Sequence, residues 1–158
     1  MRDLEILLVE DSPSDVRLIR EAIREAGARL SLTLARDGSE ALHYLSDCEY
    51  GEVRRPDLVL LDWHLPVRNG REVLAEIKSS ARLRKIPVLV LTSSAAEEDI
   101  AEAYALNANS FITKPADLES YITMVRAIDA FWRGTATLIP NRRRYAPSVA
   151  SQPQSICA

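Results

Sequence analysis

The sequence lacks several features that would assign it to a membrane, to nucleic acid or to a metal–thiolate protein. No apolar run approaches the ~20 residues that a membrane-spanning helix needs, and no signal-peptide pattern precedes the first apolar segment. The net charge of -3 at pH 7 argues against a nucleic-acid surface over the whole chain. Cys48 and Cys157 show no metal-ligand spacing. We therefore interpret both as reduced thiols and expect a cytoplasmic protein that binds neither a membrane nor nucleic acid.

The size and composition fit one globular domain with a short tail. The chain has 158 residues, 47% of them hydrophobic and 27% charged. Residues 134–158 turn to Thr, Pro, Arg, Ser and Gln, and Arg142–Arg144 form a basic cluster there. We expect a folded domain over residues 1–133 and a flexible tail over 134–158, which is too short for a DNA-binding output domain.

The most informative stretch is Leu58–Leu61, four apolar residues that end at the carboxylate of Asp62. Pro56 precedes the run and Pro66 follows it, so the run is too short for a helix and favours a strand buried on both faces. Asp62 is then at the carboxyl end of a central strand, where open α/β sheets bind their ligands. An Asp at that position could also simply cap the following turn.

Five such apolar segments alternate with five helical patterns, which predicts a parallel sheet with right-handed crossovers. The helix boundaries follow from capping residues, Pro and Gly. The expected strands are 4–9, 30–34, 58–61, 88–91 and 110–113. The expected helices are 13–26, a short one from 41, one from 70, 96–106 and 117–132, with surface connections at 47–55 and 79–85.

Polar residues follow four of these strands: Glu10 and Asp11, then Asp62, Thr92 and Lys114. Because parallel strands end at one edge of a sheet, we expect these side chains to lie close together. Crowded carboxylates repel one another and raise at least one pKa unless a cation intervenes. A site with a small number of hard oxygen ligands suits Mg²⁺, which keeps several of its waters.

This set of groups suits phosphoryl transfer, in which positioning and charge neutralisation do most of the work. Asp62 is the expected nucleophile and would form an aspartyl phosphate. Asp11, with Glu10, would hold Mg²⁺, and the backbone carbonyl of His64 could also ligate it. Lys114 and Thr92 would contact the phosphoryl oxygens.

The order Glu10-Asp11, Asp62, Thr92, Lys114-Pro115 resembles the receiver domain of bacterial response regulators, and Leu65-Pro66 with Asn69-Gly70 strengthens the likeness. The resemblance covers Leu4 to Trp132. It implies a CheY-like, flavodoxin-like, doubly wound sheet of five parallel strands in the order 2-1-3-4-5, flanked by five helices. It also implies a phosphoryl donor, the phosphohistidine of a sensor kinase, and a cis bond between Lys114 and Pro115.

Three features resemble a subgroup, the short single-domain regulators that partner bacterial phytochrome kinases. They are the loop 47–55, the segment 91–100 and a long last helix that reaches Phe131 and Trp132. The resemblance makes a bacterial phytochrome kinase the expected partner.

In the resembled family, phosphorylation draws a Thr hydroxyl toward the phosphate, and an aromatic residue of the fifth strand turns inward. Thr92 and Phe111 occupy these positions, with a plain core aromatic as the alternative for Phe111. His64 and Ser94 flank the path of a hydrolytic water and should tune the phosphoryl lifetime.

Output would pass through protein contacts on the face of the fourth helix, fifth strand and fifth helix. We expect a homodimer through Tyr104, Tyr121, Phe131 and Trp132, unless Tyr104 and Trp132 pack on their own domain.

Two other classes compete with a signalling phosphoacceptor whose catalysis is limited to its own phosphotransfer and dephosphorylation. An aspartyl-nucleophile phosphohydrolase would generally carry a second acid at position 64, which is His. A binding module such as a flavin carrier would need a phosphate-cradling loop after the first strand, and Glu10-Asp11 would repel phosphate without a metal. A degenerate receiver that never takes phosphate is a third reading.

Overall fold

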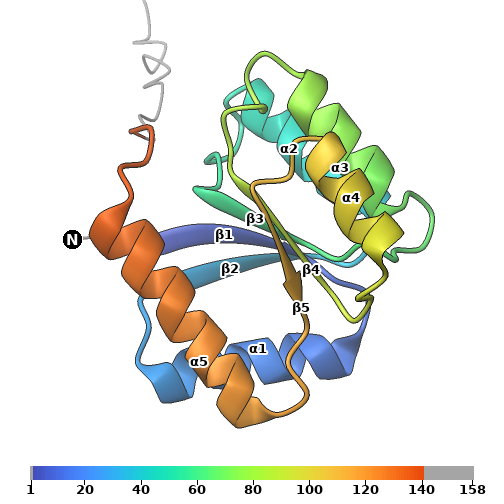
Figure 1. The fold of residues 1–158 in the computed structure, drawn as a ribbon. Helices are drawn as coiled ribbons and strands as arrows, with labels where there is room; N and C mark the ends of the chain where they lie inside the picture. Colours follow the sequence, from blue (N-terminus) through green and yellow to red (C-terminus); the bar gives the residue numbers. More distant parts are fainter. Residues whose placement is uncertain (1, 141–158) are drawn as a thin grey trace, which may run out of the picture.

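The computed structural model describes residues 2–140, and the domain is a parallel β-sheet between two layers of helices (Figure 1). Five strands form one sheet in the order β2-β1-β3-β4-β5, and every neighbouring pair is parallel. The strands are β1 (Leu4–Val9), β2 (Leu30–Ala35), β3 (Leu58–Leu61), β4 (Val88–Thr92) and β5 (Ser110–Thr113). The expected topology is confirmed, and the expected strand ranges agree to within one residue, since β2 and β4 each end one residue later than expected.

Helices α1 and α5 cover one face of the sheet, and α2, α3 and α4 cover the other (Figure 1). Their bounds are α1 (Pro13–Ala26), α2 (Gly38–Glu49), α3 (Gly70–Ser79), α4 (Glu97–Ala105) and α5 (Leu118–Asp129). Four of these helices begin with a capping side chain that accepts a hydrogen bond from the backbone amide three residues later. The capping residues are Ser12, Asp37, Asn69 and Asp117. Such caps satisfy amides that the first helical turn leaves unpaired.

Two cores form because the central strands alternate their side chains between the two faces. Leu7 and Leu61 belong to the core under α2, α3 and α4, whereas Ile6 and Leu60 belong to the core under α1 and α5. Burying each such side chain contributes roughly 1.5–3 kcal/mol. The edge strand β2 is only half-buried, as its alternating sequence indicated.

Three local expectations are wrong or incomplete. Helix α2 runs on to Glu49 and ends only where Gly51 takes a left-handed φ of 79°, so the loop is shorter than 47–55. Helix α5 continues through a π-helix, η1 (Ala130–Thr135). No cis peptide bond occurs in residues 2–140, so the Lys114–Pro115 bond has the trans form, which X-Pro bonds favour by about 0.5–1 kcal/mol.

The domain boundary at 133 stays a prediction. The π-helix crosses that position, and Leu138 packs against the core of α1 and α5. Cys157 and Arg142–Arg144 lie outside the described residues. Within the described range, none of the helices combines the length and the apolar character that a membrane crossing requires.

Val67 is strained in the loop between β3 and α3. Its φ is 66°, and the Arg68 amide donates to the Pro66 carbonyl at 2.8 Å, which makes Val67 the central residue of a γ-turn. A β-branched residue rarely adopts this conformation. The Val67 side chain is 79% exposed, so packing does not compensate for the strain.

We expect Val67→Asn to raise the free energy of unfolding by about 1 kcal/mol, because Asn tolerates the left-handed region better than a β-branched residue. Urea denaturation measures the change. Asn107, exposed and with a φ of 70°, offers the matched control, since Asn107→Val should lower stability by a similar amount. Equal stability of all three proteins would contradict the strain argument.

Candidate functional site

Backbone hydrogen bonds bring four strand ends together at one edge of the sheet. The Asp62 amide donates to the Val9 carbonyl at 3.0 Å, so Asp62 lies beside the end of β1. The Lys114 amide donates to the Thr92 carbonyl at 2.8 Å, which aligns the ends of β4 and β5. Since β1, β3, β4 and β5 are consecutive in the sheet, the residues that follow them converge, as the sequence predicted.

Three carboxylates form the centre of this edge. Oxygen atoms of Glu10, Asp11 and Asp62 all lie within 4.8 Å of one another. Glu10 is 1% exposed and Asp62 is 6% exposed, whereas Asp11 is open to solvent. An all-oxygen donor set with one solvent-facing member fits a hard divalent cation that keeps some of its waters.

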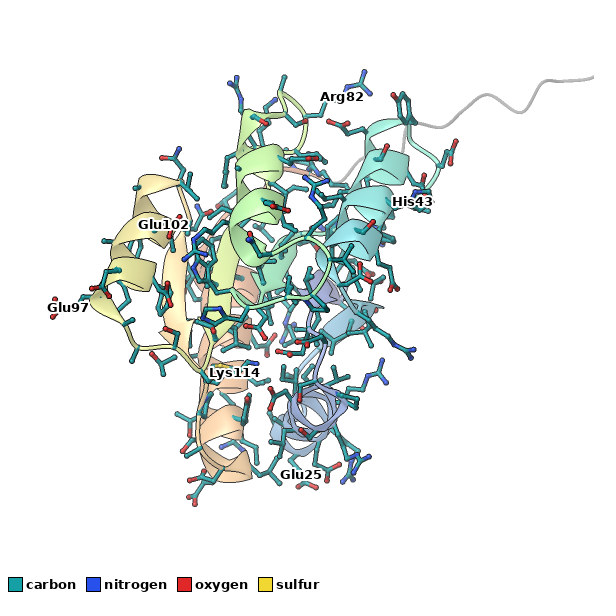
Figure 2. All side chains as sticks on the ribbon, turned by 90° about the vertical axis from the view of Figure 1, so that its right-hand side faces the viewer. Glu25, His43, Arg82, Glu97, Glu102 and Lys114 are labelled. Carbon is teal, nitrogen blue, oxygen red and sulfur yellow. The ribbon has the colours of Figure 1, made fainter. Side chains whose placement is uncertain are left out.

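Lys114 supplies the positive charge beside these acids (Figure 2). Its Nζ lies 2.7 Å from Glu10 Oε2, 2.8 Å from Asp15 Oδ2 and 3.1 Å from Asp62 Oδ2. Burial lowers the pKa of Lys114, but hydrogen bonds to Asp15 and Glu10 outweigh this and raise the pKa above its usual range. One ammonium thus contacts three carboxylates, and Asp11 adds a fourth beside Glu10 and Asp62, which leaves an excess of negative charge for a divalent cation to neutralise.

Among these acids, Glu10 has a strongly raised pKa. Burial raises its pKa to about 7, and the nearby charge of Asp62 adds to the shift. Hydrogen bonds from Lys114 and from the Ser12 amide oppose the shift. The sequence predicted a raised pKa from repulsion between carboxylates, but desolvation is the larger cause.

The loop after β3 is held against the site by Gly70. A Cβ at position 70 would lie 2.5 Å from the Asp62 carbonyl oxygen, so only glycine permits this close approach. The Gly70 amide also donates to the Trp63 carbonyl at 3.0 Å. The His64 amide lies 3.3 Å from Asp62 Oδ1, while the His64 side chain is exposed and its Nε2 lies 3.4 Å from Asp99 Oδ2.

Comparison with known proteins identifies this arrangement. Residues 6–126 match the model of the response regulator receiver domain. The chain belongs to the response regulator receiver family. It is a two-component response regulator, and the predicted family and CheY-like fold are confirmed.

Several phytochrome response regulators are similar to this receiver. Response regulator Rcp1 of Synechocystis sp. is 45% identical over 134 residues, which cover 84% of this chain and 91% of Rcp1. The crystal structure of the Mn²⁺-bound form of Rcp1 has a TM-score of 0.77, with 43% identity, and covers 87% of this chain and 99% of its own. The phosphorylated cyanobacterial phytochrome response regulator RcpA has a TM-score of 0.80, with 47% identity and the same coverage.

The two residues expected to switch occupy adjacent strands. Thr92 is fully buried, and the Ser94 amide lies 3.4 Å from its Oγ1. Phe111 is half-buried against the core of α2, α3 and α4, and its amide donates to the Tyr104 hydroxyl at 3.1 Å. Their roles in switching stay predictions.

Of the four expected interface residues, Tyr121 does not fit. It is 1% exposed and belongs to the core under α1 and α5, because it faces the sheet from the first turns of α5. Tyr104 and Phe131 are 49% and 51% exposed. Trp132 is half-buried against the core. Its ring and the Phe131 ring meet edge to face, with their centroids 5.0 Å apart.

The sequence reasoning missed three residues: Asp15, Arg71 and Asp99. Asp15 lies in the first turn of α1 and meets Lys114, ninety-nine positions away. Arg71 of α3 pairs with Asp99 of α4 at 3.2 Å. Asp15 and Asp99 lie in the first turns of their helices, where the helix dipole favours acids, so no local signal separated them from ordinary first-turn acids. No local pattern singled out Arg71 either.

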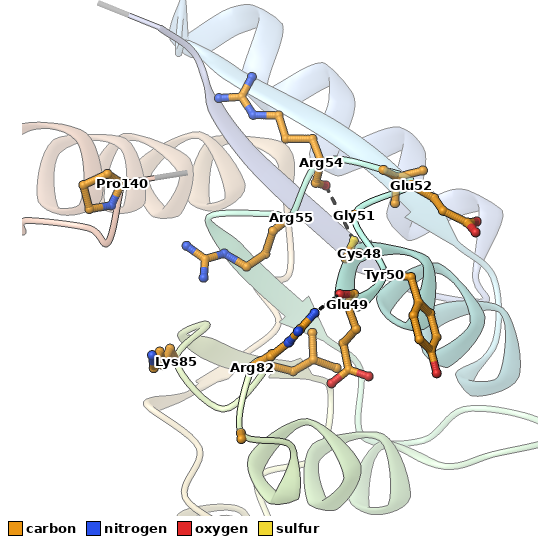
Figure 3. A pocket seen from close by; sticks show the side chains of 13 residues that line it. Cys48, Glu49, Tyr50, Gly51, Glu52, Arg54, Arg55, Arg82, Lys85 and Pro140 are labelled. Carbon is orange, nitrogen blue, oxygen red and sulfur yellow. Dashed lines mark hydrogen bonds between the residues drawn. The ribbon is translucent and has the colours of Figure 1, made fainter. Parts of the chain in front are cut away.

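A cavity of about 640 Å³ lies elsewhere, between the loop after α2 and the turn after α3 (Figure 3). Arg82 donates there to the Glu49 carbonyl. Cys48 also lines the cavity, and its thiol donates to the Arg54 carbonyl at 3.6 Å. Burial raises the pKa of Cys48 to about 12, which keeps the thiol protonated. The cavity shares no residue with the carboxylate cluster.

We expect Glu10→Gln to stabilise the metal-free protein at pH 8. The Glu10 carboxyl has a pKa of about 7 when folded against an ordinary value of 4.5, so folding loses stability as pH rises from 4.5 through 7. The gain should be about 1–3 kcal/mol, since one pKa unit corresponds to about 1.4 kcal/mol. Urea denaturation in EDTA measures it.

The gain from Glu10→Gln should vanish below pH 4.5, where both states of the wild-type carboxyl are protonated, and should shrink when Mg²⁺ is added. Glu97→Gln, an exposed acid of α4, should change stability by less than about 0.5 kcal/mol. A gain that is independent of pH would contradict a role for the Glu10 charge.

Proposed function

We propose that Asp62 accepts a phosphoryl group from the phosphohistidine of a sensor histidine kinase, with Mg²⁺ held by Glu10, Asp11, Asp62 and the backbone carbonyl of His64. The observation that carries the proposal is the convergence of three carboxylates within 4.8 Å at the end of the central strands. A bound divalent cation would neutralise charge on the phosphoryl oxygens during transfer.

The contacts of Asp62 support its role as the nucleophile. Its Oδ1 faces the His64 amide and its Oδ2 faces the Lys114 ammonium, so both carboxylate oxygens are oriented. A carboxylate oxygen forms the new bond to phosphorus as the bond from phosphorus to the kinase histidine breaks. The electron pair of the broken bond stays on the imidazole nitrogen.

Lys114 and the Thr92 hydroxyl would receive the phosphoryl oxygens. Lys114 already contacts Glu10, Asp15 and Asp62, so it can exchange one carboxylate for a phosphoryl oxygen and still keep two carboxylate partners. Thr92 ends β4 beside Lys114. Movement of Thr92 toward the phosphoryl group would then be coupled to Phe111 of β5, which lies beside Val90, two residues before Thr92 on β4.

The partner we propose is a bacterial phytochrome kinase. The support is likeness: similar structures include a cyanobacterial phytochrome response regulator and a bacteriophytochrome response regulator. Self-catalysed phosphotransfer from a small donor and self-catalysed hydrolysis would be the receiver's own reactions. The cytoplasmic setting stays a prediction.

We expect the wild-type protein with acetyl phosphate and Mg²⁺ to gain one phosphoryl adduct by intact mass, and Asp62→Asn to gain none, because an amide is not a nucleophile for phosphorus. Asp37→Asn, which alters a helix cap outside the carboxylate cluster, should retain the adduct. EDTA should abolish it in the wild type. An adduct that persists in Asp62→Asn would place the phosphoacceptor elsewhere.

We further propose a homodimer through the face of α4, β5 and α5. The support is that Tyr104 and Phe131 stay about half exposed on or next to these helices, and large aromatic side chains often anchor interfaces. Trp132 backs the Phe131 ring from the core side. Tyr121 is excluded from this surface by its burial.

Light scattering at micromolar concentration should give a dimer mass in the presence of a phosphoryl mimic, beryllofluoride with Mg²⁺. Phe131→Ala should weaken dimerisation about tenfold, the cost of losing an aromatic anchor. Tyr50→Ala removes an aromatic ring that is 79% exposed in the loop after α2, and it should leave the dimer intact. A monomer mass with and without the mimic would contradict the proposal.

A further inference from the structure

Asp99 connects α4 to three other segments beside the phosphorylation site. The Ser94 hydroxyl donates to its Oδ2 at 2.5 Å, and Arg71 donates to its Oδ1 at 3.2 Å. His64 Nε2 lies 3.4 Å from the same Oδ2. The Asp99 side chain is 14% exposed, whereas its partners His64 and Arg71 are 59% and 38% exposed, so the contacts lie at the edge of the domain surface. One carboxylate thus joins the loop after β4, helix α3 and the loop after β3.

Arg71 holds Asp99 in place. Its Nε donates to Glu102, one turn further along α4, on the side of α4 that faces α3 (Figure 2). Its guanidinium also lies over the ring of Trp63, with the carbon 5.5 Å from the ring centroid. Trp63 is fully buried and follows Asp62 directly, so Arg71 is anchored on a rigid part of the core. Because the Arg71 guanidinium is planar and pairs with two acids, it fixes the position and orientation of the Asp99 carboxylate.

Two of the residues that Asp99 contacts, Ser94 and His64, also reach the reacting groups through their backbone amides. The Ser94 amide lies 3.4 Å from Thr92 Oγ1, and the His64 amide lies 3.3 Å from Asp62 Oδ1. The backbone of each residue thus contacts the site, while each side chain reaches to Asp99 instead. Asp99 therefore competes with any water molecule for the Ser94 hydroxyl proton and for His64 Nε2.

We propose that Asp99, held by Arg71, is a positioning residue that lengthens the lifetime of the phosphorylated state by keeping the Ser94 and His64 side chains turned away from Asp62. In the hydrolysis that it slows, a water oxygen bonds to phosphorus. The bond from phosphorus to the Asp62 oxygen breaks, and its electron pair returns to the carboxylate. The proton released by water goes to solvent. The inference rests on the proposed phosphorylation of Asp62.

The test measures the lifetime directly. The full chain is phosphorylated with acetyl phosphate and Mg²⁺ and desalted, and the loss of the adduct is followed by intact mass. Asp99→Asn should shorten the lifetime about three- to tenfold, the size expected for the net loss of one ordinary hydrogen bond. Arg71→Ala should also shorten the lifetime of the phosphorylated state, because Asp99 loses the residue that holds it in place.

Two further variants separate positioning from general destabilisation. Asp99→Glu keeps the charge and should restore part of the lifetime. In a Ser94→Ala background, Asp99→Asn should have a smaller effect than in the wild type, since part of its action passes through the Ser94 hydroxyl. General destabilisation, which would lower the melting temperature, explains neither result.

Arg68→Ala is the matched control for Arg71→Ala. Arg68 lies just before α3 and pairs with Glu72 and Glu76 of that same helix, so its loss leaves the link between α3 and α4 intact. The phosphoryl adduct of Arg68→Ala should therefore have the same lifetime as that of the wild type.

An unchanged or longer lifetime in Asp99→Asn and Arg71→Ala, with normal phosphorylation, overturns this inference and leaves the proposed function standing. Equal shortening by Arg68→Ala also overturns it, because the effect would then not pass through α4. A wild-type protein that gains no adduct overturns the proposed function, and this inference with it.

Discussion

The structure depends on the burial of a carboxylate cluster at the carboxyl edge of the sheet with too little positive charge to neutralise it. Glu10 and Asp62 are almost fully buried, and Lys114 is the ammonium that contacts both. Such an arrangement costs stability in the absence of a cation, as the raised pKa of Glu10 indicates. A site that is unfavourable by itself and is relieved by a metal ion and a phosphoryl group is well suited to a molecule that must change with phosphorylation.

The fold makes this cluster possible because it supplies rigidity from both faces of the sheet. Strands β1, β3 and β4 are buried between two apolar cores, and their backbone ladder sets the ends of the strands side by side. The acids therefore cannot move apart to relieve their repulsion. The close approach of Gly70 to the Asp62 carbonyl and the strained turn at Val67 show the same constraint on the loop beside the site.

The links between α3 and α4 give the site a second layer of control. Arg71, Asp99 and Glu102 tie the two helices together, and Asp99 reaches the residues that follow Asp62 and Thr92 by two positions. Any movement of the loop after β4 toward the phosphoryl group must disturb these contacts. The same contacts join the site to α4, one element of the face that we propose for dimerisation, so site and interface share a helix.

The sequence by itself determined the alternation of strands and helices, the strand order implied by the resemblance, and the residues at the strand ends. These follow from local signals: apolar runs such as Leu58–Leu61, caps such as Ser12 and Asn69, and polar residues where each run stops. The length of α2, the π-helix after α5, the burial of Tyr121 and the partners of Asp15 and Asp99 were decided by the tertiary structure. They depend on which surfaces meet across tens of residues, and no local pattern of side chains carries that information.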